Sequence, residues 1–297
     1  MRKLLYYLWW FARCRIHGDR IPLTCSIILT DRCNLACRHC VVSNLGYRDL
    51  TFQQVMRDLE TLHRLGARVL VITGGEPFLW TDDRHAVEDV VLGARHLGFF
   101  RIVVCTNGTL GLTSSADYLW VSLDGLPAEH NRMRGEVYDR VVSQIARSRH
   151  PRININFTIS KENADQLPDS AEHMLHIPNV RGILFHLFTP YLGADKDLAL
   201  DADQRKTALD TLRRLKRRHP LKLINTFDGI RLLRNDRWER PVWSSIVVND
   251  GQVSPCCCRA GIADKDVCRN CGCSPAVETF ALQTAKPLAA LEWLRFL

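Results

Sequence analysis

Hydrophobic residues in the first two-thirds of the chain gather into short runs that alternate with helical patterns. The runs have the length and the β-branched content of buried strands, and they cover residues 24–30, 68–74, 100–106, 118–124, 152–160 and 181–188. Helical spacing of apolar positions is found in residues 51–66, 84–97, 137–148 and 163–175. This alternation predicts an α/β fold in which a parallel sheet carries its helices on the outside.

Six strand-and-helix units predict a partial (β/α)6 barrel of parallel strands. The third and fourth strands are joined by residues 107–117, and we expect this short link to contain little or no helix. The first helix should begin at Thr51, because Thr51 and Gln54 have the spacing of a capping box.

The pattern changes near residue 198. A long polar helix is predicted over 201–219, residues 221–244 are less regular, and two short strands around an Asn-Asp-Gly turn are predicted within 245–256. A small cysteine-rich C-terminal extension follows. We therefore divide the chain into an amphipathic segment, a barrel core and a C-terminal region, over residues 1–23, 24–198 and 199–297.

The N-terminal segment begins with a basic and aromatic stretch. Its apolar part, residues 4–12, is too short to span a bilayer, and no small-residue cleavage site follows it. Two interpretations stay open. Residues 1–15 form a helix in a membrane interface, which their aromatic and basic residues favour, or they form a helix that packs on the protein's own body.

The composition, 46% hydrophobic and 24% charged, is that of a globular protein with a core. Net charge is +8, and part of this excess lies in residues 213–219. Such a run is typical of a site for nucleic acid or anionic lipid. It is also typical of the solvated face of a helix whose apolar side carries Leu209, Leu212 and Leu215. We favour the helix face and expect no nucleic-acid partner.

The chain has twelve cysteines, which is many for an intracellular protein. Nine of them form two tight groups with metal-ligand spacing: Cys33, Cys37, Cys40, Cys256, Cys257, Cys258, Cys268, Cys271 and Cys273. Thiolate–metal chemistry needs a reducing compartment, so we predict a cytoplasmic protein, peripheral to the inner face of the membrane if its N-terminal helix lies in the interface. We expect Cys14, Cys25 and Cys105 to be buried thiols.

The first group follows the first predicted strand, where parallel barrels carry their chemistry. A 4Fe–4S cube held by Cys33, Cys37 and Cys40 alone has one iron without a protein ligand. A zinc ion would need a fourth ligand nearby, such as His39. An open metal position is typical of catalytic sites, so we predict that a small molecule occupies it.

CxxxCxxC after a first strand resembles the radical S-adenosylmethionine superfamily, and four later motifs agree in order. TGGEP follows the second strand, TNG the third, SLDG ends the fourth, and HNRMRG comes next. The resemblance implies that S-adenosylmethionine is held by Gly74, Gly75, Glu76, Pro77, Asn107, Ser122, Asp124 and Arg134. His39 stands where the family often places an aromatic residue near the adenine.

The resemblance also implies the chemistry. A catalytic 4Fe–4S cluster on the three thiolates passes an electron to S-adenosylmethionine, which is cleaved to a 5′-deoxyadenosyl radical that abstracts hydrogen from a substrate. A reductant such as flavodoxin or ferredoxin is implied as a partner. Glu76 either orients the glycine turn or meets the ammonium group of the cofactor.

The C-terminal cysteines resemble part of the SPASM/twitch extensions, which hold auxiliary clusters. Six thiols suffice for one four-thiolate cluster, so we predict a second 4Fe–4S cluster on Cys268, Cys271 and Cys273 with Cys256 or Cys258. A structural zinc knuckle is the alternative.

Three hypotheses for function remain. The favoured one is a maturase that acts on a peptide or protein, as many SPASM/twitch enzymes do. The second is an enzyme that modifies a membrane lipid or isoprenoid, which the N-terminal segment and the net charge suit. The third is a non-catalytic iron–sulfur protein for electron transfer or binding, which the intact cofactor motifs disfavour.

Overall fold

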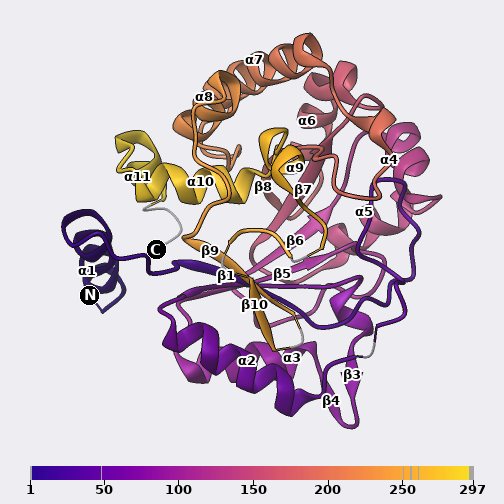
Figure 1. Cartoon of the computed structure of the whole chain (residues 1–297). Helices are drawn as coiled ribbons and strands as arrows, with labels where there is room; N and C mark the ends of the chain where they lie inside the picture. The colour runs from indigo at the N-terminus through magenta and orange to yellow at the C-terminus, as the bar shows by residue number, and fades with distance from the viewer. Residues whose placement is uncertain (1, 48, 250, 255, 260, 294–297) are drawn as a thin grey trace.

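A computed structural model describes residues 2–47, 49–249, 251–254, 256–259 and 261–293. Within these residues, eight strands form one sheet in the order β10-β9-β1-β2-β5-β6-β7-β8 (Figure 1). Their bounds are β1 Thr24–Ile28, β2 Val69–Thr73, β5 Arg101–Thr106, β6 Tyr118–Ser122, β7 Ile153–Ile159, β8 Val180–Leu187, β9 Ser245–Asn249 and β10 Gln252–Ser254. The six predicted strands pair in parallel in their chain order, which confirms the α/β fold with a parallel sheet.

The sheet is larger than the six predicted strands because a hairpin from the C-terminal region extends it. β9 pairs with β1 in parallel, and β10 pairs with β9 antiparallel. Both short strands were predicted, whereas their place beside β1 was not. Asp250 of the predicted turn lies outside the described residues. The division of the chain near residue 198 stays a prediction.

Helices cover the outer face of the sheet (Figure 1). Those between β1 and β8 are α2 Phe52–Arg64, α3 Val87–Leu97, α4 Pro127–Arg134, α5 Tyr138–Arg147 and α6 Leu167–Leu175. The predicted capping box starts α2: Gln54 N donates to Thr51 Oγ1 at 3.3 Å, and Thr51 N donates to Gln54 Oε1 at 2.9 Å. As expected, the described residues 107–117 contain no helix. Helix α4 and the small hairpin of β3 Thr81–Asp82 and β4 His85–Ala86 were not predicted.

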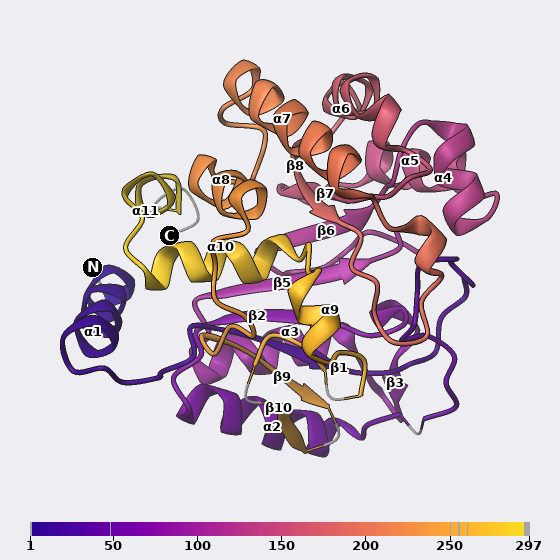
Figure 2. The same ribbon diagram turned by 45° about the horizontal axis from the view of Figure 1, so that its top comes forward.

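Five helices follow β8, namely α7 Ala202–Arg218, α8 Phe227–Asn235, α9 Lys265–Arg269, α10 Ser274–Gln283 and α11 Pro287–Trp293. In α7 the three predicted leucines are buried while Arg213 and Arg217 are exposed, so the basic run lies on a solvated helix face except at Lys216, which is buried and paired with Glu292. The expectation of irregular structure over 221–244 was wrong for α8, which Thr226 caps by accepting from Gly229 N at 2.9 Å. Figure 2 shows α10 crossing the inner side of the sheet beside α8.

Alternate residues of each strand face opposite layers. Cys25 and Ile27 of β1 are fully buried in the core with the outer helices, whereas Ser26 lines the cavities on the inner side. Cys14 and Cys105 are partly buried, so the expectation of buried thiols holds fully for Cys25.

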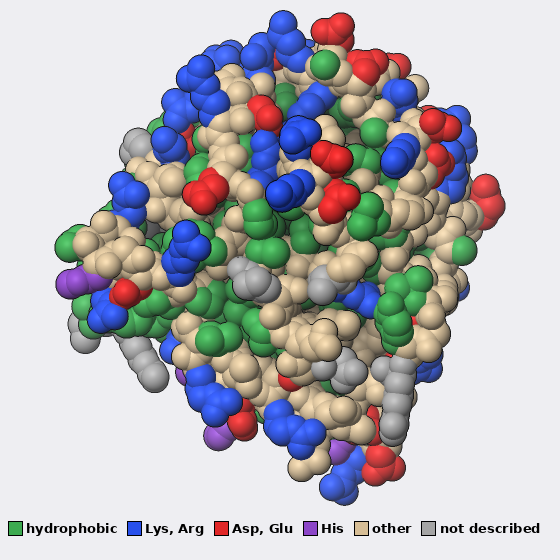
Figure 3. Space-filling model, viewed as in Figure 1, with side chains coloured by type: hydrophobic (Ala, Val, Ile, Leu, Met, Phe, Trp, Pro, Cys, Tyr) green, Lys and Arg blue, Asp and Glu red, His purple; other side chains and the backbone are tan. Residues whose placement is uncertain are grey.

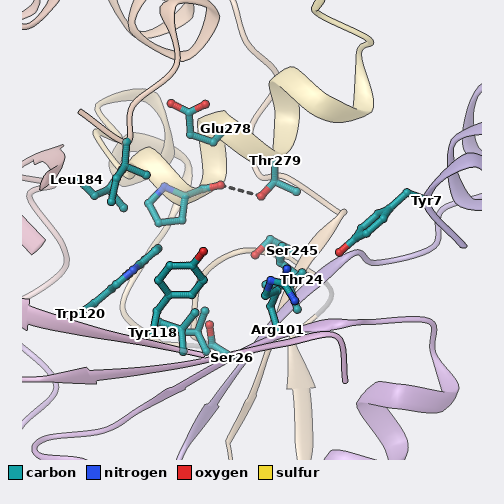
Figure 4. A pocket seen from close by; sticks show the side chains of 15 residues that line it. Tyr7, Thr24, Ser26, Arg101, Tyr118, Trp120, Leu184, Ser245, Glu278 and Thr279 are labelled. Atoms are coloured by element: carbon teal, nitrogen blue, oxygen red, sulfur yellow. Dashed lines mark hydrogen bonds between the residues drawn. The ribbon is translucent and has the colours of Figure 1, made fainter. Parts of the chain in front are cut away.

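Two cavities lie inside the curve of the sheet. One, about 110 Å³ and largely apolar, is surrounded by residues at the amino ends of the strands, such as Thr24, Arg101 and Tyr118, and by Thr279 of α10 (Figure 4). The other, about 380 Å³, lies at the carboxyl ends, next to the first cysteine group. The two share Ser26 and Val71 in their walls, so they lie one above the other in the same lumen.

Helix α1, Arg2–Ile16, contacts the body of the protein through one face. Tyr6 Oη donates to the carbonyl of Gly66, and Trp10, which is buried, donates from Nε1 to the carbonyl of Ile21 at 2.8 Å. The other face leaves large apolar side chains exposed, among them Leu4, Leu5, Leu8, Trp9 and Phe11. Figure 3 shows hydrophobic side chains at the left edge of the molecule, where α1 lies. None of the helices in the described parts of the chain is long and apolar enough to cross a bilayer.

Candidate active site

The first cysteine group lies in the loop after β1, at the carboxyl end of the sheet. Cys33, Cys37 and Cys40 are all partly exposed there. Cys33 Sγ accepts from Leu35 N at 3.4 Å and from Asn107 Nδ2 at 3.7 Å. Burial raises the pKa values of the Cys33 and Cys37 thiols, and the neighbouring Cys40 adds to both shifts. The loop therefore brings the three sulfurs into one electrostatic neighbourhood.

Gly74 and Gly75 let the turn after β2 pack directly on the cysteine loop. Gly75 N donates to the carbonyl of Thr30 at 2.8 Å, and Glu76 N donates to that of Arg32 at 2.8 Å. A Cβ on Gly74 would lie 2.5 Å from the carbonyl oxygen of Thr30, and one on Gly75 would lie 2.3 Å from that of Arg32. Both distances are shorter than any real contact, so two residues without side chains are needed to join the loops.

Glu76 is fully buried, and its carboxylate is occupied by the protein. It accepts from Thr106 Oγ1 at 2.8 Å, from Asn107 N at 2.7 Å and from Phe78 N at 3.1 Å. Burial raises its pKa, and these hydrogen bonds oppose the shift. Of the two roles expected for Glu76, the geometry favours orienting the turn. Pro77 begins the short 3-10 helix Pro77–Leu79 that follows.

Arg134 joins a buried carboxylate to the cysteine group. Its Nε donates to Asp124 Oδ2 at 2.5 Å, and its Nη1 lies 3.9 Å from Cys37 Sγ. Burial raises the pKa of Asp124, but Arg134, His39 and the hydrogen bond from Thr158 N together outweigh burial and hold the pKa of that carboxyl below its usual value. Thr158 N donates to the other carboxylate oxygen at 2.7 Å. The pair thus holds a fixed cation beside the thiols.

His39 lies in the wall of the larger cavity, next to the cysteine group. Burial, with a contribution from Arg134, lowers the pKa of His39 to about 4, so the ring is neutral at pH 7. Its Nδ1 has no hydrogen-bond partner among the described residues. Ser122 ends β6 and stands opposite Asn156 of β7 in the strand register.

Two polar residues that the sequence analysis did not select form the opposite wall of this cavity. His186 of β8 is hydrogen bonded through Nε2 to Asn156 Oδ1, and its Nδ1 accepts from Ser274 N at 3.4 Å. Burial lowers the pKa of His186 to about 4. The ring is therefore neutral with its proton on Nε2, because Nδ1 is used as an acceptor. Both residues were detectable as polar positions that interrupt apolar runs.

The C-terminal cysteines lie close together beside Tyr191. Cys271 is buried and Cys273 lines the larger cavity. Burial raises the pKa of the Cys271 thiol to about 11, and the neighbouring Cys257 adds to it. Burial raises the pKa of the Cys268 thiol, and the neighbouring Cys257 and Cys256 raise it further. The structure thus places members of the triplet beside the later three cysteines.

Cys257, which was not among the expected ligands, is the electrostatic neighbour of several other thiols in this group. A hydrogen bond with Cys258 lowers the pKa of Cys257 to about 7 and raises that of Cys258. This contact places Cys257 and Cys258 side by side, so either thiol could serve as a metal ligand. Sequence spacing alone had no means of choosing among three consecutive cysteines.

The donor sets bear on which metal group fits. Among the described residues, no three His, Cys, Asp or Glu side chains are gathered as ligands of a single metal ion. A four-iron cube spaces its ligand sulfurs more widely, because each thiolate binds a different iron. The three thiols are partly exposed and lie beside the glycine turn and the fixed guanidinium of Arg134. This arrangement fits a four-iron cube whose open iron binds the amino-acid part of a ligand.

Comparison with known proteins agrees with this geometry. Residues 27–174 match the model of the radical SAM superfamily. The chain therefore carries a radical SAM domain, and it belongs to a superfamily of enzymes that use a 4Fe–4S cluster and S-adenosylmethionine.

Particular relatives can be named. The chain is 32% identical over 225 residues to pre-heme d1 synthase of Dinoroseobacter shibae, covering 66% of this chain and 53% of that protein. It is 30% identical over 170 residues to mycofactocin maturase MftC of Mycolicibacterium smegmatis, covering 52% of this chain and 42% of that protein. The chain thus spans about half the length of these curated relatives.

A solved structure shares the fold. Streptococcus suis SuiB bound to the precursor peptide SuiA superimposes with a TM-score of 0.66 at 15% identity, over 82% of this chain and 62% of that chain. At this identity the likeness concerns the arrangement of strands and helices.

Proposed function

We propose that the protein is a radical SAM enzyme that abstracts hydrogen from a peptide or protein substrate. When bound, the cluster and S-adenosylmethionine supply a one-electron reductive cleavage that gives a 5′-deoxyadenosyl radical. Cys33, Cys37 and Cys40 would hold the cluster. Arg134, already fixed by Asp124, would meet the carboxylate of the methionine moiety at the open iron.

The remaining motif residues would shape the cofactor site. Gly74 lines the larger cavity, while Glu76 fixes the turn through Asn107 and Thr106. Asn107 also contacts Cys33, so it links the turn to the cluster loop. His39 would pack near the adenine as a neutral ring.

The observation that carries the choice of a peptide is a groove continuous with the larger cavity. This groove has a volume of about 840 Å³ and shares Leu187, Phe188 and Tyr191 with the cavity wall. Side chains of both signs line it, including Lys196, Arg205, Lys206, Asp201, Asp236 and Asp264. A large groove with apolar and charged side chains beside a catalytic cavity suits an extended chain whose reacting residue enters the cavity. The relative named as a maturase supports the same class.

We also propose an auxiliary 4Fe–4S cluster on the C-terminal cysteines. Cys268, Cys271 and Cys273 would supply three ligands, and Cys257 joins Cys256 and Cys258 as a candidate for the fourth. Tyr191 lies between this group and the catalytic cavity. A cluster there would be close enough to the substrate to accept the electron released when a new bond forms.

Mass spectrometry tests the peptide proposal. The protein would be expressed together with the short peptides encoded beside its gene, and each peptide would be examined for a change in mass. We expect one of them to change with the wild-type protein and none with Cys37→Ala. If the wild-type protein cleaves S-adenosylmethionine and leaves every peptide unchanged, the substrate belongs to another class.

A tetrapyrrole is the second candidate substrate, because a relative at 32% identity is named pre-heme d1 synthase. The same reconstituted protein would be incubated with a porphyrin that carries propionate side chains. Loss of mass from the porphyrin, coupled to formation of 5′-deoxyadenosine, would favour this candidate over the peptide.

The exposed face of α1 supports peripheral contact with the inner face of a membrane. Its apolar residues are accompanied by the exposed Arg15, which anionic headgroups attract. However, α1 contacts Gly66 and Phe100, which precede β2 and β5, so it lies at the end of the barrel away from the cysteines. A lipid would enter from the wrong end, and this argues against the lipid-modifying alternative.

Vesicle co-sedimentation tests this contact. The triple variant Leu5→Ser, Leu8→Ser and Trp9→Ser should lose binding to phosphatidylglycerol vesicles and keep its melting temperature. Trp10 is left unchanged because it is buried and hydrogen bonded. Equal sedimentation of the two proteins would exclude α1 as the contact.

A further inference from the structure

Arg259 is a buried cation in the wall of the catalytic cavity and has no acidic partner among the residues that the structure describes. It follows Cys258, is 7% exposed, and lines the larger cavity together with His186 and Gly74. Its guanidinium stacks on the ring of Tyr47 at 5.0 Å, which holds it in place. Within the described residues its Nη1 has no hydrogen-bond partner, and no carboxylate lies within ion-pair distance of it.

Such a side chain is costly for the folded protein. A buried charge without a counter-ion loses hydration free energy, which a contact with an aromatic ring offsets only in part. Arginine stays protonated at any ordinary pH, so it cannot escape this cost by losing a proton. A residue with this cost in a cavity is explained when a bound anion restores the missing partner.

The carboxylates near the cavity are already engaged elsewhere. Asp124 is taken by Arg134 and by Thr158 N, and Glu76 accepts three hydrogen bonds from its own surroundings. Neither is left to neutralise Arg259. Asp31, which lines a neighbouring cavity with Arg259, accepts from Tyr47 N at 3.1 Å and forms no ion pair with Arg259. An anion on the molecule that enters the larger cavity would supply the missing partner.

The wall formed by β7 and β8 presents a donor to the same space. The tautomer of His186 fixes the Asn156 amide, because Nε2–H of the ring takes the Asn156 oxygen. This leaves the NH2 group of Asn156 as the end that is available to a ligand in the cavity. A cation and an amide donor thus line one cavity, and each can bind an acceptor oxygen of a ligand.

We propose that Arg259 binds a carboxylate of the substrate and that Asn156 donates to the same or an adjacent oxygen. The substrate is then an acid at or near its reacting residue, such as a peptide with a glutamate or aspartate side chain. This inference rests on the proposed function, since it places the substrate in the cavity beside the cofactor. A porphyrin propionate offers the same chemistry, and the test separates the two sources.

Arg259 is assigned to the substrate and not to the cofactor because of where each arginine lies. Arg134 is the guanidinium that touches the first cysteine group, at 3.9 Å from Cys37 Sγ. Arg259 belongs to the tail beyond β10 and stacks on Tyr47, and its position in the cavity wall is shared with residues of β8. Loss of Arg259 should therefore leave the affinity for S-adenosylmethionine unchanged.

The experiment measures binding to the reconstituted protein with S-adenosylmethionine present. Two matched pairs of probes are used: coproporphyrin III with its tetramethyl ester, followed by fluorescence, and acetyl-Gly-Glu-Gly-amide with its glutamine counterpart, followed by NMR. The variants are Arg259→Gln and Arg259→Lys. Arg213→Gln is the matched control, because Arg213 is an exposed arginine of α7 that lines neither the larger cavity nor the groove.

We expect the wild-type protein to bind one of the acids at least about tenfold more tightly than its uncharged partner. Arg259→Gln should lose about tenfold for that acid, Arg259→Lys should lose less, and Arg213→Gln should bind like the wild type. If the glutamate peptide is the preferred acid, the group that Arg259 binds is a carboxylate of a peptide. If the porphyrin is preferred, that group is a propionate.

Three results would overturn the inference. Arg259→Gln binds the acid as well as the wild type does, neither acid is preferred over its uncharged partner, or Arg259→Gln loses affinity for S-adenosylmethionine and so marks a cofactor residue. Failure of the proposed function looks different: reduced protein that does not form 5′-deoxyadenosine while acid binding still depends on Arg259.

Discussion

Replacing His130 with asparagine should remove part of the acid sensitivity of the fold. His130 is fully buried in α4, and its Nδ1 accepts from Asp124 N at 3.2 Å. Its Nε2 has no partner among the residues the structure describes. Burial lowers the pKa of His130 to about 4, Asp124 opposes this shift, and Arg134 and His39 add to it. An asparagine oxygen can accept the same hydrogen bond without titrating.

The sign and size of the effect on stability follow from the pKa values of His130 in the unfolded chain and in the folded protein. In the unfolded chain the histidine titrates near 6.5, its ordinary value. Between 6.5 and about 4 the unfolded chain binds a proton that the folded protein does not, so stability is full above this window and falls as pH decreases through it. The difference corresponds to about 3.4 kcal/mol in total, of which about 1.2 kcal/mol is lost between pH 7.0 and pH 5.5.

Urea unfolding at pH 7.0 and pH 5.5 measures this contribution, with every protein in the same cluster state. The free energy of unfolding of His130→Asn should change by about 1.2 kcal/mol less between the two pH values than that of the wild type. His17→Asn is the control, because His17 is exposed. Equal pH dependence of the wild type and His130→Asn would refute the inference that burial holds this ring neutral.

Further predictions concern the two cysteine groups. Gly75→Ala should lower iron incorporation and the melting temperature, because its Cβ would lie 2.3 Å from the carbonyl of Arg32, whereas Gly111→Ala, with nothing within 4 Å, should match the wild type in both assays. Cys37→Ala should abolish formation of 5′-deoxyadenosine and keep the iron of the C-terminal group, so retained cleavage would place the catalytic cluster elsewhere. Cys271→Ala should lose iron and substrate turnover but keep uncoupled cleavage, and an unchanged iron content would show that the C-terminal group holds no cluster.

The alternation of apolar runs was sufficient to predict the parallel sheet. Each strand is covered on both faces, so each appears in the sequence as a short, nearly continuous apolar run. The alternation missed α8 because the stretch from Thr226 to Asn235 is short and lies between irregular segments. Its cap hydrogen bond became visible in the structure. The position of β9 was also out of reach, since pairing with β1 joins strands separated by more than 200 residues.

Some residues of the candidate site could likewise be predicted from the sequence, and others could not. Local motifs identified the thiols, the glycine turn and Arg134, since each belongs to a short segment of fixed spacing. Asn156, His186 and Arg259 were missed because they are scattered over distant elements and meet only in the folded protein. For Glu76 the sequence left two roles open, and its hydrogen bonds in the structure favour orienting the turn.

The pairing of β9 with β1 has a consequence for how the chain is made. β1 leaves the ribosome well before β9, the strand that covers its outer edge, because more than 200 residues separate the two. During synthesis the edge of Thr24–Ile28 therefore stays open to other chains, next to the loop that must receive iron. Sheet closure and delivery of the C-terminal cysteines occur together, so the nascent protein can load its first cluster before the second group arrives.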